Sequence, residues 1–163
     1  MVDPLTSLWN RQGMYNILKY RMDEYLLSKT SFAVAILDID NFKQINDTYG
    51  HDAGDQILIT IGQSLMAGCR ETDAIGRWGG EEFLLLINES NSKNVIEIAE
   101  RIRTMIESQN ISLPFVTSLK TTVTIGLTRI LSGTYSTLQE MINQADQALY
   151  QGKRNGRNRI VTV

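Results

Sequence analysis

The sequence of 163 residues has little cysteine or proline, and it contains no long apolar run. Its one cysteine, Cys69, is unable to form an internal disulfide or a cysteine metal site, which fits a reducing, cytoplasmic location. No apolar stretch approaches the roughly 20 residues of a membrane span, and residues 1–10 lack the pattern of a signal peptide. We therefore expect no membrane contact by this domain, which leaves open whether a larger parent protein is attached to a membrane.

A strong net charge is also absent. The 16 Lys and Arg residues against 18 Asp and Glu residues give a net charge of −2, so the basic surface expected of a duplex-binding protein is lacking and no nucleic-acid partner is expected. With 42% hydrophobic residues and 2 prolines, the composition excludes disordered and collagen-like classes. The length is that of one domain, so we predict a single domain over residues 1–163.

Helical and strand-like patterns alternate along the chain, which predicts a mixed α and β domain. Helices are predicted after Asn10 as N-cap, after a loop at residues 52–55, after Ser92 as cap, and after a capping box at residues 137–140. Strands are predicted at residues 32–37, 73–78, 83–87, 119–131 and 159–163, with a loop or hairpin at residues 109–118. Gly79 and Gly80 are expected to form a hairpin turn with positive φ, and Gly156 to help end the last helix.

The chemistry begins at Asp38. It follows the apolar run at residues 32–37, which is typical of a strand buried on both faces. A carboxylate at such a position is costly unless it is paired, hydrogen-bonded or bound to a metal. Considered alone, Asp38 more often only caps the following turn, and that alternative stays open here.

Two adjacent acids, Glu81 and Glu82, occupy the predicted hairpin turn. If the hairpin strands lie beside the first strand, Glu81 and Asp38 converge at one edge of the sheet. Oxygen ligands without His or Cys favour Mg²⁺ or Mn²⁺, and Mg²⁺ takes its remaining ligands from water and substrate phosphates. The alternative is a solvated hairpin tip.

Three cations are candidates for a phosphate site at this edge. Lys43 follows Asp38 by five residues, and Lys153 and Arg157 lie near the end of the last predicted helix. The alternative for the second pair is a solvated basic helix end that complements the helix dipole.

The segment around residues 49–55 carries groups that are able to read a purine. The amide of Asn46 and the carboxylate of Asp55 together match the hydrogen-bonding edge of guanine. Helix capping by Asp55 is the alternative. His51 has no Ser or Cys partner nearby in the sequence, so we interpret it as a loop-packing residue.

Taken together, these motifs resemble the GGDEF domains, the diguanylate cyclases. The signature is Arg77-Trp78-Gly79-Gly80-Glu81-Glu82-Phe83, in its Glu-Glu form. The resemblance also includes residues 3–11, 37–47, 50–55, 148–150 and 156–158, and so extends over essentially the whole chain. Ser7 replaces the glycine usual in the opening signature, and Trp78 stands where Tyr or Phe is common.

The resemblance implies an α+β fold, an α/β sandwich whose central sheet is mainly antiparallel, with packed helices, as in polymerase palms and class III nucleotide cyclases. It implies that two GTP molecules are condensed into cyclic di-GMP with release of two pyrophosphates, with Mg²⁺ as cofactor and Mn²⁺ as the alternative. Each domain of this family holds one GTP, so a transient homodimer is implied for catalysis.

The resemblance also assigns roles to residues. Asp38, the Ile39 carbonyl and Glu81 are implied to hold the metal, with Glu81 helping to deprotonate the attacking 3′-hydroxyl and Glu82 supporting the site. The residues implied to bind the substrate are Leu5, Phe42, Lys43, Asn46, His51, Asp55, Gly79, Gly80, Lys153 and Arg157.

Arg70-Glu71-Thr72-Asp73 resembles the inhibitory Arg-x-x-Asp motif of the family, at the expected distance before the signature. With Arg101, residues Arg70 and Asp73 are implied to bind cyclic di-GMP and so to cause product inhibition, although an ordinary surface turn is the alternative. Two other functions remain open: a non-catalytic module that binds GTP or cyclic di-GMP, and a related cyclase with a different dinucleotide product. The presence of the signature acids and of the guanine-reading residues favours the enzyme.

Overall fold

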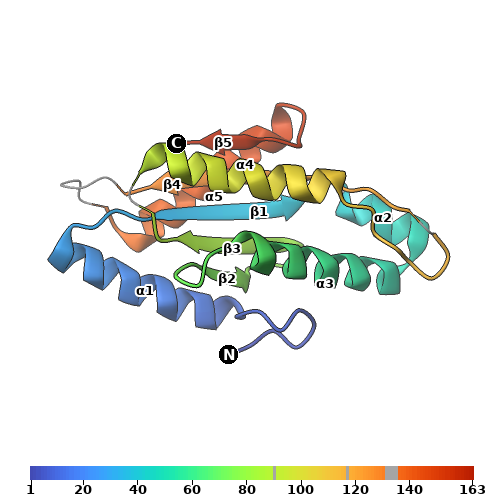
Figure 1. Cartoon of the computed structure of the whole chain (residues 1–163), viewed down its shortest axis with the longest axis horizontal. Helices are drawn as coiled ribbons and strands as arrows, with labels where there is room; N and C mark the ends of the chain where they lie inside the picture. Colours follow the sequence, from blue (N-terminus) through green and yellow to red (C-terminus); the bar gives the residue numbers. More distant parts are fainter. Residues whose placement is uncertain (90, 117, 131–135) are drawn as a thin grey trace.

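The computed structural model describes residues 1–89, 91–116, 118–130 and 136–163, which form one five-stranded sheet with helices on both faces (Figure 1). The elements in chain order are α1 (Arg11–Ser28), β1 (Ala33–Ile39), α2 (Phe42–Tyr49), α3 (His51–Gly68), β2 (Ala74–Arg77), β3 (Glu82–Ile87), α4 (Ser92–Ser108), β4 (Val123–Arg129), α5 (Leu138–Arg154) and β5 (Ile160–Thr162). The predicted α+β class is confirmed. No helix in these ranges is long and apolar enough to cross a membrane.

The sheet has the strand order β2-β3-β1-β4-β5. Strand β1 runs antiparallel to both of its neighbours, β3 and β4, and only the β4–β5 pair is parallel. All seven residues of β1 are buried, so the prediction of a central strand covered on both faces is confirmed. The register places Asp38 of β1 opposite Glu82 of β3 on one side and opposite Thr124 of β4 on the other.

Two apolar cores fill the spaces between the sheet and its helices. One core joins the odd-numbered side chains of β1 to α3 and α4, and it includes Ile57, Ile61, Leu65, Ile98 and Ile102. The other joins the even-numbered side chains of β1 to α1 and α5, and it includes Met14, Leu18, Met141, Ala145 and Leu149. Because side chains alternate along a strand, Asp38 belongs to the α1–α5 face.

Two of the predicted helix caps are confirmed, and one is wrong by a residue. The side chain of Asn10 accepts a hydrogen bond from the amide of Gly13, and that of Thr137 accepts one from the amide of Glu140. Helix α4 is capped by Asn91 and not by Ser92, because the Asn91 side chain accepts from two amides of the first turn.

The segment after β1 differs from the prediction. Residues 42–49, for which no helix is predicted, form helix α2. Helix α3 already begins at His51, so the predicted loop at residues 52–55 is helical. The two helices pack closely at Gly54, where an added Cβ atom would lie 1.8 Å from the side-chain oxygen of Asn46. Helix capping by Asp55 is therefore excluded, since Asp55 lies inside α3 and the N-cap is Gly50.

Three smaller differences concern strand and turn geometry. Strand β4 is shorter than the predicted 119–131: Leu119 forms an isolated bridge with Ile111 instead, and residue 131 lies outside the described residues. The turn glycines Gly79 and Gly80 do not have the predicted positive φ. The turn is closed by hydrogen bonds from the amides of Trp78 and Gly79 to the Glu82 carbonyl. Gly156 does adopt positive φ, at 114°.

Candidate active site

The buried acid Asp38 is paired with a cation from the other end of the chain. Asp38 is 3% exposed at the end of β1, and its Oδ2 atom lies 2.6 Å from Nζ of Lys153 on α5. Burial is the largest influence and raises the pKa of Asp38, while the Lys153 ammonium opposes that rise. The carboxylate is therefore committed to an ion pair, and the alternative that it only caps a turn is wrong.

The hairpin turn brings Glu81 to Asp38, as the sequence predicted. The Ile39 amide donates to the Glu81 carbonyl over 3.3 Å, which fixes the turn against the end of β1. Burial, together with the neighbouring Asp38 charge, raises the pKa of Glu81 to about 7. The carboxylates of Asp38 and Glu81 thus share a confined space, and the charge of one disfavours ionisation of the other.

Glu82 lies on the other side of the turn, toward α1. Burial raises its pKa, and the charges of Asp38 and Asp146 add to the increase, while Lys153 and Arg11 oppose it. Arg11 stacks over the Trp78 ring at 4.3 Å and donates to the Trp78 carbonyl. Glu82 thus feels charges from both α1 and α5, and it is not among the residues that line the cleft beside Glu81.

A cleft of about 450 Å³ opens at this edge of the sheet, beside the end of β1 where α2 begins. Asp38, Ile39 and Glu81 line it together with four of the predicted substrate-binding residues, namely Phe42, Lys43, Lys153 and Arg157. Four acids and three cations from separate parts of the chain thus line one opening, the acids being Asp38, Asp40, Asp47 and Glu81. This combination suits an anionic ligand that enters with a divalent cation.

The donor set of the cleft fits Mg²⁺ or Mn²⁺. Asp38 and Glu81 offer carboxylate oxygens, and the crowding that raises the pKa of Glu81 is relieved when a divalent cation neutralises both charges. Within the described ranges there is no group of three or more His, Cys, Asp and Glu side chains arranged to hold a metal ion. Two carboxylates with water and phosphate ligands are the pattern that Mg²⁺ prefers.

Asp40 is a residue of this region that the sequence analysis missed. It is buried, and its carboxylate accepts hydrogen bonds from the hydroxyls of Thr122 and Thr124 and from the amide of Asn158. Asp40 therefore ties the turn after α5 to β4. The period of two in Asp38-Ile39-Asp40 was the available signal, since it puts both acids on one face of the strand.

The predicted guanine-reading residues lie at the α2–α3 corner. Asn46 faces Gly54, and Asp55 is the next residue along α3. The Asn46 Oδ1 atom is buried and, among the described residues, has no hydrogen-bond partner. A buried acceptor without a partner is costly, so a ligand N–H group at this corner would stabilise it.

The remaining predicted substrate residues lie around this core of the site. Leu5 packs against the cluster that includes residues of α3. His51 is exposed at the start of α3 and borders a separate cavity with residues 113–116, so the structure does not bring it to the cation-lined cleft. Gly80 is exposed, with no atom within 4 Å of an added Cβ, whereas at Gly79 the Glu82 side chain would lie 3.2 Å away.

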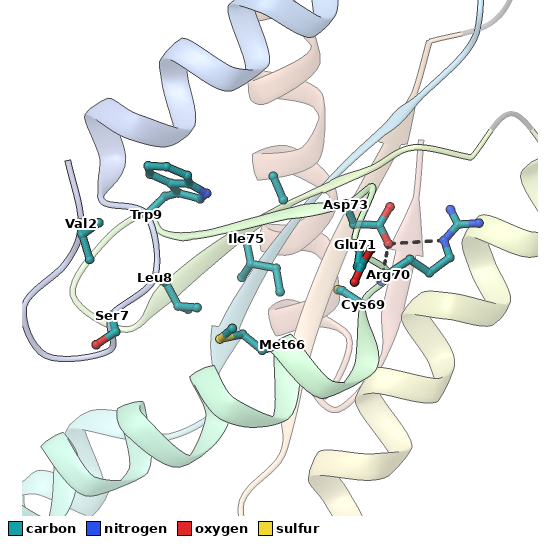
Figure 2. Close-up of a pocket in the computed structure, with 11 residues that line it drawn as sticks. Val2, Ser7, Leu8, Trp9, Met66, Cys69, Arg70, Glu71, Asp73 and Ile75 are labelled. Carbon is teal, nitrogen blue, oxygen red and sulfur yellow. Dashed lines mark hydrogen bonds and ion pairs between the residues drawn. The ribbon is translucent and has the colours of Figure 1, made fainter.

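Two of the predicted inhibitory residues, Arg70 and Asp73, lie just before the edge strand β2 (Figure 2). The register places the start of β2 level with the start of β1, at the opposite end of the strands from Asp38. Asp73 has a fully buried side chain that accepts from the amides of Arg70 and Asn88. The Arg70 guanidinium lies 3.3 Å from a Glu89 carboxylate oxygen and donates to the Asn88 carbonyl. Arg101 donates to the Gly68 carbonyl at the end of α3.

Arg70 and Asp73 stand at one end of a cavity of about 440 Å³ between the N-terminal segment, α3 and β2 (Figure 2). Most of its other lining is apolar, with Trp9, Met66 and Ile75 among the contributors. Burial raises the pKa of the Cys69 thiol in this wall to about 12, so it is uncharged at neutral pH. Asp73 is used to shape the turn, and Arg70 is the member of the motif that is accessible to a ligand.

Comparison with known proteins connects this geometry to one family. The family model described as "Diguanylate cyclase, GGDEF domain" matches residues 1–159. Diguanylate cyclase DosC of Escherichia coli strain K12 is 35% identical over 159 residues, which cover 98% of this chain and 34% of DosC. The chain thus spans about a third of the length of this curated relative.

Solved structures agree in fold. The GGDEF domain of DgcB from Caulobacter crescentus, in complex with cyclic di-GMP, superposes with a TM-score of 0.92 at 31% identity, covering 99% of this chain and 92% of that one. The active GGEEF domain of a diguanylate cyclase from Vibrio cholerae gives a TM-score of 0.86 at 28% identity, covering 95% and 97%. On the family match over residues 1–159 and these likenesses, the chain belongs to the GGDEF domain family.

Proposed function

We propose that this chain is a diguanylate cyclase domain, which condenses two GTP molecules into cyclic di-GMP and releases two pyrophosphates. The observation that carries the proposal is the convergence of Asp38, Glu81 and Lys153 in one cleft, from a strand, a hairpin turn and a distant helix. Relatives that are named diguanylate cyclases, and a Vibrio cholerae domain that is described as active with the same Glu-Glu signature, support it.

The metal in this proposal is Mg²⁺, with Mn²⁺ as the alternative. Asp38, the Ile39 carbonyl and Glu81 would hold it. When bound, such an ion supplies charge neutralisation at the reacting phosphate and lowers the cost of ionising a hydroxyl. Because Asp38 lies at the end of β1 and Glu81 stands on a hairpin turn that is hydrogen-bonded to β1, this donor set would be assembled before the substrate arrives.

The chain's own groups would handle the triphosphate and the proton. The 3′-hydroxyl of one GTP attacks the α-phosphate of the other, so that a P–O bond forms and the bond to pyrophosphate breaks. Glu81, which lines the same cleft, would help to accept the hydroxyl proton. Lys43, Lys153 and Arg157 would neutralise the phosphates and the departing pyrophosphate, with Phe42 presenting its backbone amide at the start of α2.

The purine end would bind at the α2–α3 corner. There Asn46 and Asp55 would read guanine, with Leu5 and His51 beside the base and Gly79 and Gly80 allowing the nucleotide close to the hairpin. The reaction joins two nucleotides, so a transient homodimer with facing clefts would supply the second GTP. Arg70, Asp73 and Arg101 would form the product-binding inhibitory site, and a cytoplasmic location is expected for the domain.

Product analysis tests the proposal directly. A dimer enforced by a fused coiled coil is incubated with GTP and Mg²⁺, and the products are identified by chromatography. We expect cyclic di-GMP and two equivalents of pyrophosphate, and no product from Glu81→Ala. Binding of a nonhydrolysable GTP without turnover would instead indicate a non-catalytic module, and a different dinucleotide would identify a related cyclase.

A further inference from the structure

The turn between α5 and β5 has an unusual backbone. Gly156, Arg157 and Asn158 follow one another with φ values of 114°, 64° and 46°. Residues other than glycine pay a conformational cost in this left-handed region, so such a turn persists only where contacts hold it. Arg157, the second of these residues, lines the cation-rich cleft.

Contacts from the sheet hold the turn on one side. The Asn158 amide donates to Oδ2 of Asp40 at 3.0 Å and lies 3.2 Å from Oγ1 of Thr124. Asp40 is 4% exposed and also accepts from two threonine hydroxyls of β4 and the segment before it. This side fixes the backbone position of the turn.

Contacts from helix α4 hold the Asn158 side chain. Nη1 of Arg103 donates to its amide oxygen at 2.7 Å, and its amide nitrogen donates to the Glu107 carboxylate. Arg103 also pairs with Glu100 and Glu107 along its own helix, and its side chain is 14% exposed. The Arg103 guanidinium is therefore held in one orientation. Its contact with Asn158 joins two residues that are 55 positions apart in the sequence.

We infer that Arg103 is a positioning residue: acting from α4 through Asn158, it fixes the left-handed turn that presents Arg157 to the triphosphate of the substrate. This inference rests on the proposed function, because it assigns the phosphate-binding role to Arg157. The alternative is that Arg103 only stabilises α4 through its pairs with Glu100 and Glu107, as charged pairs on helix surfaces commonly do.

Two structural facts favour the positioning role. Arg103 has a fork of donors, and the structure uses one arm of it on a residue outside the helix. Asn158 has both of its side-chain polar atoms bound to α4, and its amide is bound to the sheet, so it joins the two elements that enclose the turn. After loss of the α4 contacts, relaxation of the positive-φ backbone is opposed by the sheet contacts and by two local hydrogen bonds. In these the Arg157 amide donates to the Gly152 carbonyl, and Nε of Arg159 donates to the Arg157 carbonyl.

The inference is tested by calorimetric titration of the full chain in Mg²⁺. One titration uses a nonhydrolysable GTP analogue, and a separate one uses GMP. Arg103→Ala should weaken triphosphate binding about two- to tenfold, as expected from the net value of one hydrogen bond, and leave GMP binding unchanged. Arg103→Lys keeps a charge beside Glu100 but lacks the fork, so it should show the same selective loss in a chain with an intact α4. Glu97→Gln, an exposed acid on the same helix, is the matched control.

A double-variant cycle separates the contact from general destabilisation. Asn158→Gly removes the side chain while keeping the permitted backbone, and its combination with Arg103→Ala should bind triphosphate no more weakly than the worse single variant. Additive losses, equal losses for GMP and the triphosphate, or wild-type affinity in both Arg103 variants would overturn the inference alone. A wild-type chain that binds neither nucleotide would overturn the proposed function, and the inference with it.

Discussion

Nζ of Lys153 lies 2.6 Å from Oδ2 of Asp38, across 115 positions of sequence. The chain thus places its own cation on the acid that is proposed to bind the metal. In the metal-free protein this ammonium compensates a buried carboxylate. Under the proposed function it would turn to the phosphates when nucleotide binds, and the pair would then link the stability of the domain to the occupancy of its cleft.

Replacement of Lys153 by Ala should destabilise the metal-free chain and weaken GTP binding. Breaking a fully buried pair costs about 3–5 kcal/mol, and since the Lys153 side chain is 32% exposed we expect a smaller loss, about 1–2 kcal/mol. Urea denaturation in EDTA measures it. Arg154→Ala, at the next position, is the control and should stay near the wild-type value. An unchanged free energy of unfolding in Lys153→Ala would show that the pair contributes nothing.

The metal-free domain should become less stable as pH rises through neutrality. The pKa of Glu81 is about 7 in the folded state against an ordinary 4.5, so the stabilising effect of its proton is complete below about pH 4.5 and is lost as pH passes 7. The raised pKa values of Asp38 and Glu82 act in the same direction. Denaturation curves between pH 4.5 and 8 in EDTA should show this slope, and Glu81→Gln should flatten it. The same slope in both proteins would contradict the assignment.

Replacement by alanine should change the free energy of unfolding by different amounts at two glycines, Gly126 and Gly80. At Gly126, an added Cβ would lie 2.1 Å from the Ala145 carbonyl oxygen and 2.3 Å from the Leu149 amide nitrogen, so Gly126→Ala should cost about 3 kcal/mol of stability. At Gly80 nothing lies within 4 Å, so Gly80→Ala should change the free energy of unfolding by less than about 0.5 kcal/mol. Its methyl group should nevertheless weaken GTP binding, if the nucleotide approaches the hairpin as proposed. Denaturation and nucleotide titration of the same two variants check both statements.

The residues of the inhibitory motif should separate into binding and structural roles. Arg70 has a side chain that is 44% exposed, so Arg70→Ala should retain the fold and lose cyclic di-GMP affinity. Asp73 is fully buried and accepts two backbone amides, so Asp73→Ala should cost about 1–3 kcal/mol of stability. Glu89→Gln removes an anion that competes for Arg70 and should raise product affinity. Calorimetry with cyclic di-GMP distinguishes the three, and unchanged affinity in Arg70→Ala would refute the assigned role.

Much of the fold could be predicted from the sequence, because apolar runs, capping residues and turn residues agree with the packing of the structure. The unbroken apolar run before Asp38 predicts a strand covered on both faces, and β1 is one. Asn10 and Thr137 have side chains suited to capping, and each accepts the expected amide. The glycine-rich turn and its acids predicted a hairpin that meets Asp38, and the structure brings them together.

The α2–α3 corner was not readable for an equally physical reason. In helix α2 the side chains of Phe42, Ile45 and Tyr49 do fall at helical spacing, but the helix has only eight residues. Its N-cap Asn41 has a left-handed backbone without a side-chain cap, so capping does not mark where it begins. Its register depends on Gly54 of α3, a tertiary contact. Asp40 was missed for the same reason, because its partners lie more than 80 positions away.

At Gly126 the backbone of α5 packs directly against the backbone of β4. Helix α5, which carries Lys153, is therefore held closely against the sheet that carries its partner Asp38. A designed inhibitor that carries a phosphate mimic therefore meets a preformed anchor at this end, with little reorganisation to offset its affinity. The α2–α3 corner, where we propose that the purine binds, is different in kind. There α2 contributes the buried side chain of Phe42 and the Oδ1 atom of Asn46, which has no hydrogen-bond partner among the described residues. Selectivity between relatives is accordingly to be sought in the base-mimicking half of such a compound, and potency in its anionic half.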